Sequence, residues 1–367
     1  MSAEVNDRTH MAHALQLAAR GLTTTDPNPR VGCVIVAGDE VVGEGWHVRA
    51  GEAHAEAIAL DRAGDQAAGS TVYVTLEPCC HEGRTPPCVD QLVHAKVSRV
   101  VYAANDPNPA VAGQGAERLR NAGIDVQPGL METESRLLNP GFFSRMIRNR
   151  PWVRSKLAVS VDGRTALANG TSKWITGEAA RSDVQRWRAR STAILTGAGT
   201  VIADDPSLNV RDPELSDAGQ PMRVIVDSHL RMSPKARVLS IPGDTAVLYC
   251  DALDKTAREL ACSGARVEKM PATDGRVALE AVMSWLSQMQ VNELLVEAGP
   301  ILNGALMEAG LIDEYLIYVA SHILGSDARG MFGISAVQKM SDRVELQLID
   351  VRQVGDDLRL RYAAGAE

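Results

Sequence analysis

Long apolar runs and aromatic residues are scarce in this chain of 367 residues. Phe, Trp and Tyr together make up 4% of it, and no stretch approaches the roughly 18 uninterrupted apolar residues of a membrane span. The first ten residues, MSAEVNDRTH, hold no apolar core of the kind that a signal peptide has. We therefore expect a cytoplasmic protein with no membrane partner.

Cysteine and basic charge are also limited. Six cysteines are too few for a disulfide scaffold in a chain of this length. The net charge is −8, and 14 basic and 18 acidic residues precede position 151, while 24 and 28 follow it. Neither half offers the positive field that sequence-independent nucleic-acid binding needs, so we expect small-molecule substrates and no nucleic-acid partner.

The composition and length are those of a folded protein with more than one core. The apolar fraction is 45%, the charged fraction is 23%, and the length favours two domains. In the first half, alternating strand and helix patterns predict an α/β domain with a mostly covered sheet. The expected elements are a helix over 8–20, a hairpin around Gly38 and Asp39, helices over 53–63 and 88–95, and strands over 71–76 and 98–104.

This alternation stops at 139–151, so we expect the domain boundary near residue 148, with domains 1–148 and 149–367. The α/β alternation then resumes. The expected strands are 152–160, 191–197, 222–227, 245–250 and 291–298, and the segments 314–320, 344–354 and 358–364 complete the sheet.

Four residues of the first half form a candidate catalytic zinc site. His54 and Glu56 open a predicted helix, while Cys79 follows a strand and Cys88 starts the next helix. A catalytic zinc ion takes three protein ligands, here one His and two thiolates, and lowers the pKa of the water in its fourth position to about 7. Glu56 is then free to carry protons to a ring nitrogen and to the departing ammonia. H-x-E followed by P-C is the pattern of zinc nucleobase deaminases.

The cysteine spacing leaves alternatives for the ligands. Eight residues separate Cys79 from Cys88, more than in the usual P-C-x-x-C motif, so Cys80 or His81 could replace Cys88. We expect that Cys33, Cys80 and His81 do not bind the zinc ion. A structural zinc ion, or none, is the plainer explanation of the loop, but a structural site normally supplies a fourth ligand.

Four runs in this half, PNPRVGCVIV, GEAHAEAIAL, YVTLEPCCHEGRTPPC and NDPNPAVAGQG, resemble the deaminase half of the bifunctional riboflavin-biosynthesis deaminase–reductase. The long cysteine spacing is the pattern of that family, although its members usually carry Ser at the position of Cys80. The resemblance implies a cytidine-deaminase-like domain with one Zn²⁺ per chain on His54, Cys79 and Cys88, and with Glu56 as the catalytic proton donor. It also implies substrate contacts at Asn28, His47 and Arg84.

The second half contains no G-x-G-x-x-G, which leaves a standard Rossmann domain without support. Two predicted strands run into glycine-rich turns, at 197–200 and at 299–300, and a predicted helix follows the second turn. Such a turn presents free N–H groups to a phosphate, but it also serves tight packing, so nucleotide binding stays one of two interpretations.

The resemblance continues in SKLAVSVDGRTA, SKWIT, RSDVQRWRARSTAILTGAGTVIADDPSLNVR, RVIVDS and VEAGPILNGAL. It implies a dihydrofolate-reductase-like domain that uses NADPH. The implied cofactor-binding residues are Ala158, Trp174, Thr200, Asp204, Ser228, Gly299, Pro300, Ile301, Leu302, Asn303, Gly304 and Ala305. The implied substrate contacts are Ser172, Arg188, Leu208, Arg211 and Glu297.

The resulting prediction is a bifunctional enzyme of riboflavin biosynthesis. Its first domain would hydrolyse the exocyclic amine of 2,5-diamino-6-ribosylamino-4(3H)-pyrimidinone 5′-phosphate. Its second would reduce the ribosyl group of 5-amino-6-(5-phosphoribosylamino)uracil to ribityl with NADPH. Lys156, Asp162 and Asp204 are the candidates for a proton step in that reduction, and no pattern chooses among them. The resemblance also implies a homo-oligomer, either a dimer or a tetramer.

Two other functions stay open on the sequence alone. One is a deaminase of a nucleoside or of tRNA with an unrelated partner domain, against which the acidic balance and the cysteine spacing argue. The other is a zinc-stabilised binding protein whose second half senses a nucleotide. Replacing Glu56 by Gln distinguishes the two, because an enzyme should then lose turnover and keep its zinc, whereas a binding protein should keep its ligand binding.

Overall fold

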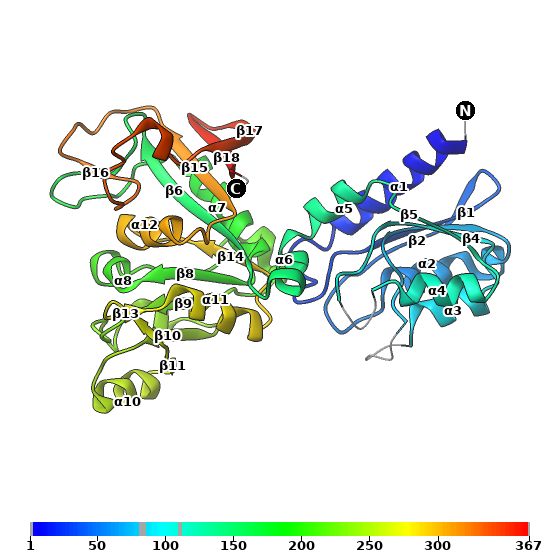
Figure 1. Cartoon of the computed structure of the whole chain (residues 1–367), viewed down its shortest axis with the longest axis horizontal. Coiled ribbons are helices and arrows are strands. Elements are labelled where there is room, and N and C mark those ends of the chain that lie inside the picture. Colours follow the sequence, from blue (N-terminus) through cyan, green and yellow to red (C-terminus); the bar gives the residue numbers. More distant parts are fainter. Residues whose placement is uncertain (1–2, 81–85, 109–111, 366–367) are drawn as a thin grey trace. The chain divides into compact units, whose positions relative to one another are not determined.

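The computed structural model describes residues 3–80, 86–108 and 112–365. The chain divides into two compact units, Met1–Asn149 and Arg150–Glu367. Each unit is built around its own sheet (Figure 1). Within the described ranges, no helix is both long and apolar enough to cross a membrane.

The described part of the first unit is built on a five-stranded sheet in the order β2-β1-β3-β4-β5. β1 is antiparallel to both β2 and β3, whereas β3, β4 and β5 are parallel. The strands are β1 (Gly32–Ala37), β2 (Glu40–Trp46), β3 (Thr71–Leu76), β4 (Arg99–Ala104) and β5 (Asp125–Pro128). The helices are α1 (Ala3–Ala19), α2 (Ala55–Ala63), α3 (Cys88–His94), α4 (Gln114–Asn121), α5 (Glu132–Leu138) and α6 (Pro140–Arg148). Every element expected in this half is present.

Helices cover both faces of this sheet. Cys33 and Ile35 of β1 face the core that α2, α3 and α4 complete, whereas Val34 and Val36 pack against α1. Alternate residues of one strand therefore enter two different cores. This is why the uninterrupted apolar run GCVIVA forms a strand with both faces buried.

The second unit contains a nine-stranded sheet in the order β11-β10-β9-β8-β14-β6-β15-β18-β17. The strands from β11 to β15 in this order are parallel, and β18 and β17 add an antiparallel edge. The strands are β6 (Trp152–Ser160), β8 (Ala193–Gly197), β9 (Met222–Val226), β10 (Thr245–Tyr249), β11 (Arg266–Lys269), β14 (Glu293–Val296), β15 (Glu314–Ala320), β17 (Leu346–Val354) and β18 (Asp357–Ala364). The helices are α7 (Glu178–Arg190), α8 (Ala198–Asp204), α9 (Arg237–Ser240), α10 (Asp254–Cys262), α11 (Leu279–Gln288) and α12 (Pro300–Glu308). Two short antiparallel pairs join β7 (Arg164–Ala166) to β16 (Arg329–Gly330) and β12 (Ala272–Thr273) to β13 (Arg276–Val277).

Two apolar cores flank this larger sheet as well. Met283 and Leu286 of α11 and Leu306 of α12 belong to the core on one face. Val184 and Trp187 of α7 belong to the core on the other face. The sheet is therefore covered on both sides, as its continuous apolar strands predict.

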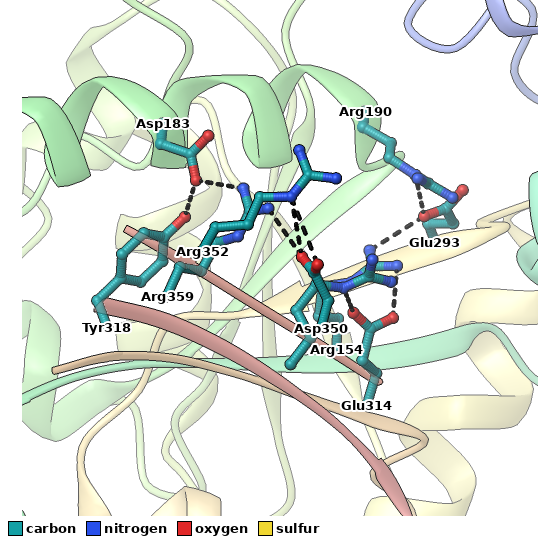
Figure 2. A network of polar contacts seen from close by, with 10 residues as sticks. Arg154, Asp183, Arg190, Glu293, Glu314, Tyr318, Asp350, Arg352 and Arg359 are labelled. Carbon is teal, nitrogen blue, oxygen red and sulfur yellow. Dashed lines mark hydrogen bonds and ion pairs between the residues drawn. The ribbon is translucent and has the colours of Figure 1, made fainter. Parts of the chain in front are cut away.

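A layer of ion pairs connects α7 to the strands beneath it (Figure 2). Arg154 of β6 donates to Glu293 at 3.0 Å and to Glu314 at 2.9 Å, and all three side chains are buried. Arg190 of α7 reaches the same Glu293 oxygen at 2.8 Å. Farther along, Asp183 of α7 accepts hydrogen bonds from Tyr318 and Arg359 (Figure 2). The charges thus hold α7 against β6, β14, β15 and β18.

Trp187 of α7 lies in the middle of this layer. Four guanidinium groups lie within 6 Å of its ring centre, at 4.6 Å for Arg154, 5.2 Å for Arg361, 5.6 Å for Arg359 and 5.9 Å for Arg190. The face of an indole ring attracts cations, and the attraction is larger where water is excluded. The arginines therefore have both carboxylates and an aromatic face as partners.

Candidate active sites

The start of α2 carries the predicted metal ligand His54 and the predicted catalytic residue Glu56. His54 is the N-cap of α2, and Glu56 lies in its first turn. Strand β2 packs directly on this helix, since a Cβ atom added at Gly45 would lie 2.2 Å from the carbonyl oxygen of Ala55. Only glycine permits so close an approach of the two backbones, which fixes the helix start against the sheet.

The two cysteine ligands come from the ends of β3 and α3. Cys79 follows β3 by three residues, and Cys88 is the first residue of α3. The backbone N–H of Cys88 lies 3.4 Å from the Cys79 sulfur, and the N–H of Val89 donates to the Cys79 carbonyl at 3.2 Å. The start of α3 is therefore bound to the Cys79 segment.

His54, Cys79 and Cys88 converge on one point. The Nδ1 atom of His54 lies 3.2 Å from the Cys88 sulfur and 3.5 Å from the Cys79 sulfur, and the three candidate ligand atoms all lie within 4.8 Å of one another. In a tetrahedral zinc site with Zn–S near 2.3 Å and Zn–N near 2.05 Å, an N and an S ligand are about 3.6 Å apart. The donor set and its spacing therefore fit Zn²⁺.

Glu56 is a buried acid beside this triad. Its side chain is almost completely buried, and this burial raises the pKa of its carboxyl group. The Cys88 thiol, by contrast, donates to Cys79 and lowers the pKa of Cys79 to about 4, while it raises the pKa of Cys88. The carboxyl group of Glu56, whose pKa is raised, thus lies beside the two sulfur atoms. The raised pKa suits Glu56 to take up and release protons.

Asn28 and His47 lie next to the metal ligands. Asn28 Nδ2 is 3.1 Å from His47 Nε2, and His47 Nδ1 is 3.1 Å from the carbonyl oxygen of Ala53. The imidazole therefore carries its proton on Nδ1, which leaves Nε2 to accept from Asn28. Burial lowers the pKa of His47, which favours the neutral form of the ring. The rings of His47 and His54 meet edge to face, with centroids 5.6 Å apart.

The other residues named for the first domain are either outside the described residues or outside the triad. Arg84 and His81 are outside the described residues. Cys80 packs against the core of α2, α3 and α4, and Cys33 is completely buried in β1. Among the described residues neither belongs to the triad.

Sequence reasoning did not single out two carboxylates beside the triad. The buried Glu77 accepts hydrogen bonds from the backbone N–H groups of Asp106, Gly113 and Ala116, at 3.3, 3.0 and 3.1 Å. Burial raises the pKa of Asp106 itself to about 6. Both residues lie in runs that carry the family resemblance, Glu77 in YVTLEPCCHEGRTPPC and Asp106 in NDPNPAVAGQG, but neither was assigned a role.

In the second unit, the two predicted glycine turns lie side by side. They follow β8 and β14, which are neighbours in the sheet, and they lead into α8 and α12. The N–H of Gly299 donates to the hydroxyl of Thr200 at 3.2 Å, which joins the turns. Ligands of open α/β sheets bind at such carboxyl ends of strands. The resemblance implies cofactor contacts at both turns, at Thr200 and at 299–305.

Arg188 and Glu297 form a buried pair next to these turns. Arg188 donates to both carboxylate oxygens of Glu297, at 2.6 and 2.9 Å, and to the carbonyl oxygen of Asn209 at 3.0 Å. Burial alone would raise the pKa of Glu297, but the charge of Arg188 outweighs it and holds this pKa at about 2. Burial also lowers the pKa of Lys156, which interacts with the charges of Glu297 and Arg188.

The three candidates for a proton step have different surroundings. Lys156 is half-buried and interacts electrostatically with Glu297 and Arg188. Asp162, in contrast, accepts from the Ser160 hydroxyl and from the N–H groups of Leu324 and Gly325, so it serves to hold a loop. Asp204 is the last residue of α8, and its carbonyl oxygen accepts from Lys173.

The remaining implied contacts are spread around the carboxyl ends of the strands. Trp174 is 70% exposed, and the Arg181 guanidinium lies 4.7 Å from its ring. Ser228 follows β9, and its hydroxyl accepts from the N–H of Val277 at 3.1 Å. Ala158 lies in β6, Ser172 lies between β7 and α7, and Leu208 and Arg211 lie between α8 and β9.

Comparison with known proteins gives matches to both units. Residues 4–104 match the cytidine and deoxycytidylate deaminase zinc-binding region, and residues 151–360 match the RibD C-terminal domain. The chain is 48% identical to the riboflavin biosynthesis protein RibD of Escherichia coli K12, over 97% of this chain and 99% of that protein. It is 45% identical to RibD of Haemophilus influenzae, over 97% of each chain.

Solved structures agree over the whole chain. A crystal form of Acinetobacter baumannii RibD has 46% identity and a TM-score of 0.92, and covers 99% of this chain and 100% of that one. A Thermotoga maritima structure, named as a diaminohydroxyphosphoribosylaminopyrimidine deaminase/5-amino-6-(5-phosphoribosylamino)uracil reductase, has 30% identity and a TM-score of 0.87, with coverage of 99% and 100%.

Fold, triad and matches define a two-domain α/β protein with a deaminase-type zinc centre and a reductase-type second domain. This confirms the expected fold class. The chain belongs to the RibD family of riboflavin biosynthesis proteins.

Proposed function

We propose that this chain catalyses two consecutive steps of riboflavin biosynthesis. The first is the hydrolytic deamination of 2,5-diamino-6-ribosylamino-4(3H)-pyrimidinone 5′-phosphate. The second is the NADPH-dependent reduction of the ribosyl group of 5-amino-6-(5-phosphoribosylamino)uracil to ribityl. The observation that carries the proposal is the convergence of His54, Cys79 and Cys88 beside the buried Glu56.

In the first step, the residues of the chain divide the work. His54, Cys79 and Cys88 would hold Zn²⁺, which acts as a Lewis acid and makes water a nucleophile near neutral pH. Glu56 would take a proton from the attacking water and deliver protons to the ring nitrogen and to the leaving amine. We assign Asn28, His47 and Arg84 to the substrate, because Asn28 and His47 lie beside the triad and a cation at Arg84 suits a phosphate.

In the second step, the protein mainly positions the reactants. We assign NADPH to the neighbouring turns at Thr200 and 299–305 and to Ala158, Trp174, Asp204 and Ser228. We assign the substrate to Ser172, Arg188, Leu208, Arg211 and Glu297. The adjacency of the two turns at the carboxyl ends of β8 and β14 supports this assignment. We also propose that the enzyme acts as a homo-oligomer and that the boundary between its two domains in the sequence falls near residue 148.

Replacing Glu56 by Gln tests the deaminase assignment. Glu56→Gln should keep near-stoichiometric zinc and lose at least about 100-fold in ammonia release, because the amide cannot transfer protons. Zinc is measured by elemental analysis, and ammonia is measured with the phosphorylated diaminopyrimidinone as substrate. Asp61→Asn, an exposed carboxylate on the same helix, is the matched control and should behave like the wild type. Undiminished ammonia release in Glu56→Gln contradicts the assignment.

A further inference from the structure

Arg118 of α4 contacts the chain beside both cysteine ligands. Its Nη1 donates to the carbonyl oxygen of Cys80 at 2.7 Å, and its Nη2 donates to the carboxylate of Asp90 at 2.5 Å. Cys80 follows the ligand Cys79 directly, and Asp90 lies two residues after the ligand Cys88, in the first turn of α3. One guanidinium group therefore connects the two segments that carry the thiolates.

The helix that carries Arg118 is itself held firmly against the Cys79 segment. The Glu77 carboxylate accepts N–H groups at the start of α4, from Gly113 and Ala116. A Cβ atom added at Gly115 would lie 2.1 Å from the carbonyl oxygen of Pro78, so the backbones of α4 and of the Cys79 segment are in contact. Arg118 thus extends from a helix whose backbone is fixed against the Cys79 segment.

We propose that Arg118 is a positioning residue that sets the separation of Cys79 and Cys88 for zinc. It acts on a backbone carbonyl and on a carboxylate of α3, not on a ligand atom. A planar guanidinium fixes two acceptors in one geometry, which a single ammonium cannot do. This inference rests on the zinc site of the proposed function. It adds a residue that neither the zinc motif nor the resemblance indicated.

The alternative is that Arg118 and Asp90 form an ordinary surface ion pair. Their side chains are 46% and 51% exposed, and pairs of this kind typically contribute little to stability. The two roles therefore predict different results. A surface pair changes neither metal affinity nor metal geometry, whereas groups that orient ligands typically change metal affinity by about 10–100-fold.

The experiment compares full-length wild type, Arg118→Met and Arg118→Lys. Zinc affinity is measured by competition with a chromogenic chelator, and ligand geometry by the visible absorption of the Co²⁺-substituted protein. Arg118→Met should bind zinc about 10-fold more weakly and show an altered Co²⁺ spectrum, with a nearly unchanged melting temperature. Arg118→Lys keeps the charge and should recover only part of the affinity. Arg120→Met removes an exposed charge from the same helix and should match the wild type.

Wild-type zinc affinity together with a wild-type Co²⁺ spectrum in Arg118→Met overturns the proposal. If Arg118→Met fails to fold, Asp90→Asn is measured in its place, because it weakens one of the two contacts of Arg118. A zinc affinity below that of the wild type then supports the proposal, and an unchanged zinc affinity overturns it. A different result would contradict the proposed function. If the wild-type protein binds zinc but releases no ammonia, the proposed function is wrong, whereas the comparison of zinc affinities between the variants remains valid.

Discussion

At the scale of single residues, the metal centre depends on which neighbouring thiol points toward His54. Cys79 and Cys88 meet its Nδ1 atom, whereas Cys80 turns toward the core of α2, α3 and α4. The carbonyl of Cys80 points to Arg118. Adjacent cysteines thus have different surroundings, with the sulfur of Cys79 in the triad and that of Cys80 against the core.

This arrangement predicts opposite effects for two conservative substitutions. Cys80→Ser should leave the zinc content at the wild-type level, because its sulfur is outside the triad. Cys88→Ser should remove most of the zinc, because it takes one of three ligands from a site that needs all of them. Elemental analysis of the two purified variants measures this. Zinc loss in Cys80→Ser would mean that the ligand set is wrong.

The sequence indicated the metal ligands but not their surroundings. His54, Glu56 and Cys79 stand in a motif whose chemistry requires these residue types, whereas the choice of Cys88 over Cys80 or His81 came from the resemblance. The hydrogen bond from Asn28 to His47 joins residues that are 19 positions apart. No local pattern encodes such a contact, and only the resemblance placed these residues in a site.

At the scale of elements, the buried ion pairs of Figure 2 hold α7, and therefore Arg188, in place. Glu314 of β15 accepts from Arg154 of β6 and from Arg361 of β18, at 2.9 and 2.7 Å. Burial would raise the pKa of Glu314, but the two arginines outweigh it and lower this pKa from 4.5 to about 2.

Glu314→Gln should therefore destabilise the second unit, and the loss should depend on pH. Removing one member of a buried charge network typically costs about 3–5 kcal/mol, because the remaining charges stay unpaired. Since the folded pKa is depressed, the stabilisation is complete above about pH 4.5 and is lost as the pH falls toward 2. Denaturant unfolding from pH 7 to pH 3 measures the difference from the wild type, which should shrink in acid. Glu280→Gln, an exposed change, is the control; a difference that does not vary with pH contradicts this account.

The apolar strands of both sheets were predicted from the sequence, whereas polar edge elements were not. β5 (DVQP) and β11 (RVEK) lie at the edges of their sheets and contain no apolar run. α4 was missed because its eight residues, QGAERLRN, bury only Gly115, Ala116 and Leu119. Such a helix is held by its neighbours, here by Glu77 at its start, and tertiary contacts of this kind are invisible to periodicity.

At the scale of the whole molecule, each unit contains its own sheet and its own candidate site. The triad and Glu56 belong to Met1–Asn149, and the Arg188–Glu297 pair and both glycine turns belong to Arg150–Glu367. Since all the residues described for each site come from one unit, loss of one chemistry need not disturb the other.

Glu56→Gln supplied with the deaminated pyrimidine should therefore oxidise NADPH at the wild-type rate. Given the diaminopyrimidinone instead, the same variant should oxidise almost none, because no product of the first step forms. Absorbance at the reduced nicotinamide band follows both reactions. Impaired oxidation of NADPH with the deaminated substrate would show that Glu56 acts beyond its own unit.

The contact of β2 with α2 also limits how this protein can vary. Gly43 and Gly45 both face the backbone of α2, where an added Cβ atom would lie 2.2 Å from the carbonyl oxygens of Ala59 and Ala55. Every missense change in a glycine codon adds at least that atom. A mutation at either position would push on the helix whose first turn holds His54 and Glu56. An inherited loss of deaminase activity can thus arise at residues that touch neither metal nor substrate.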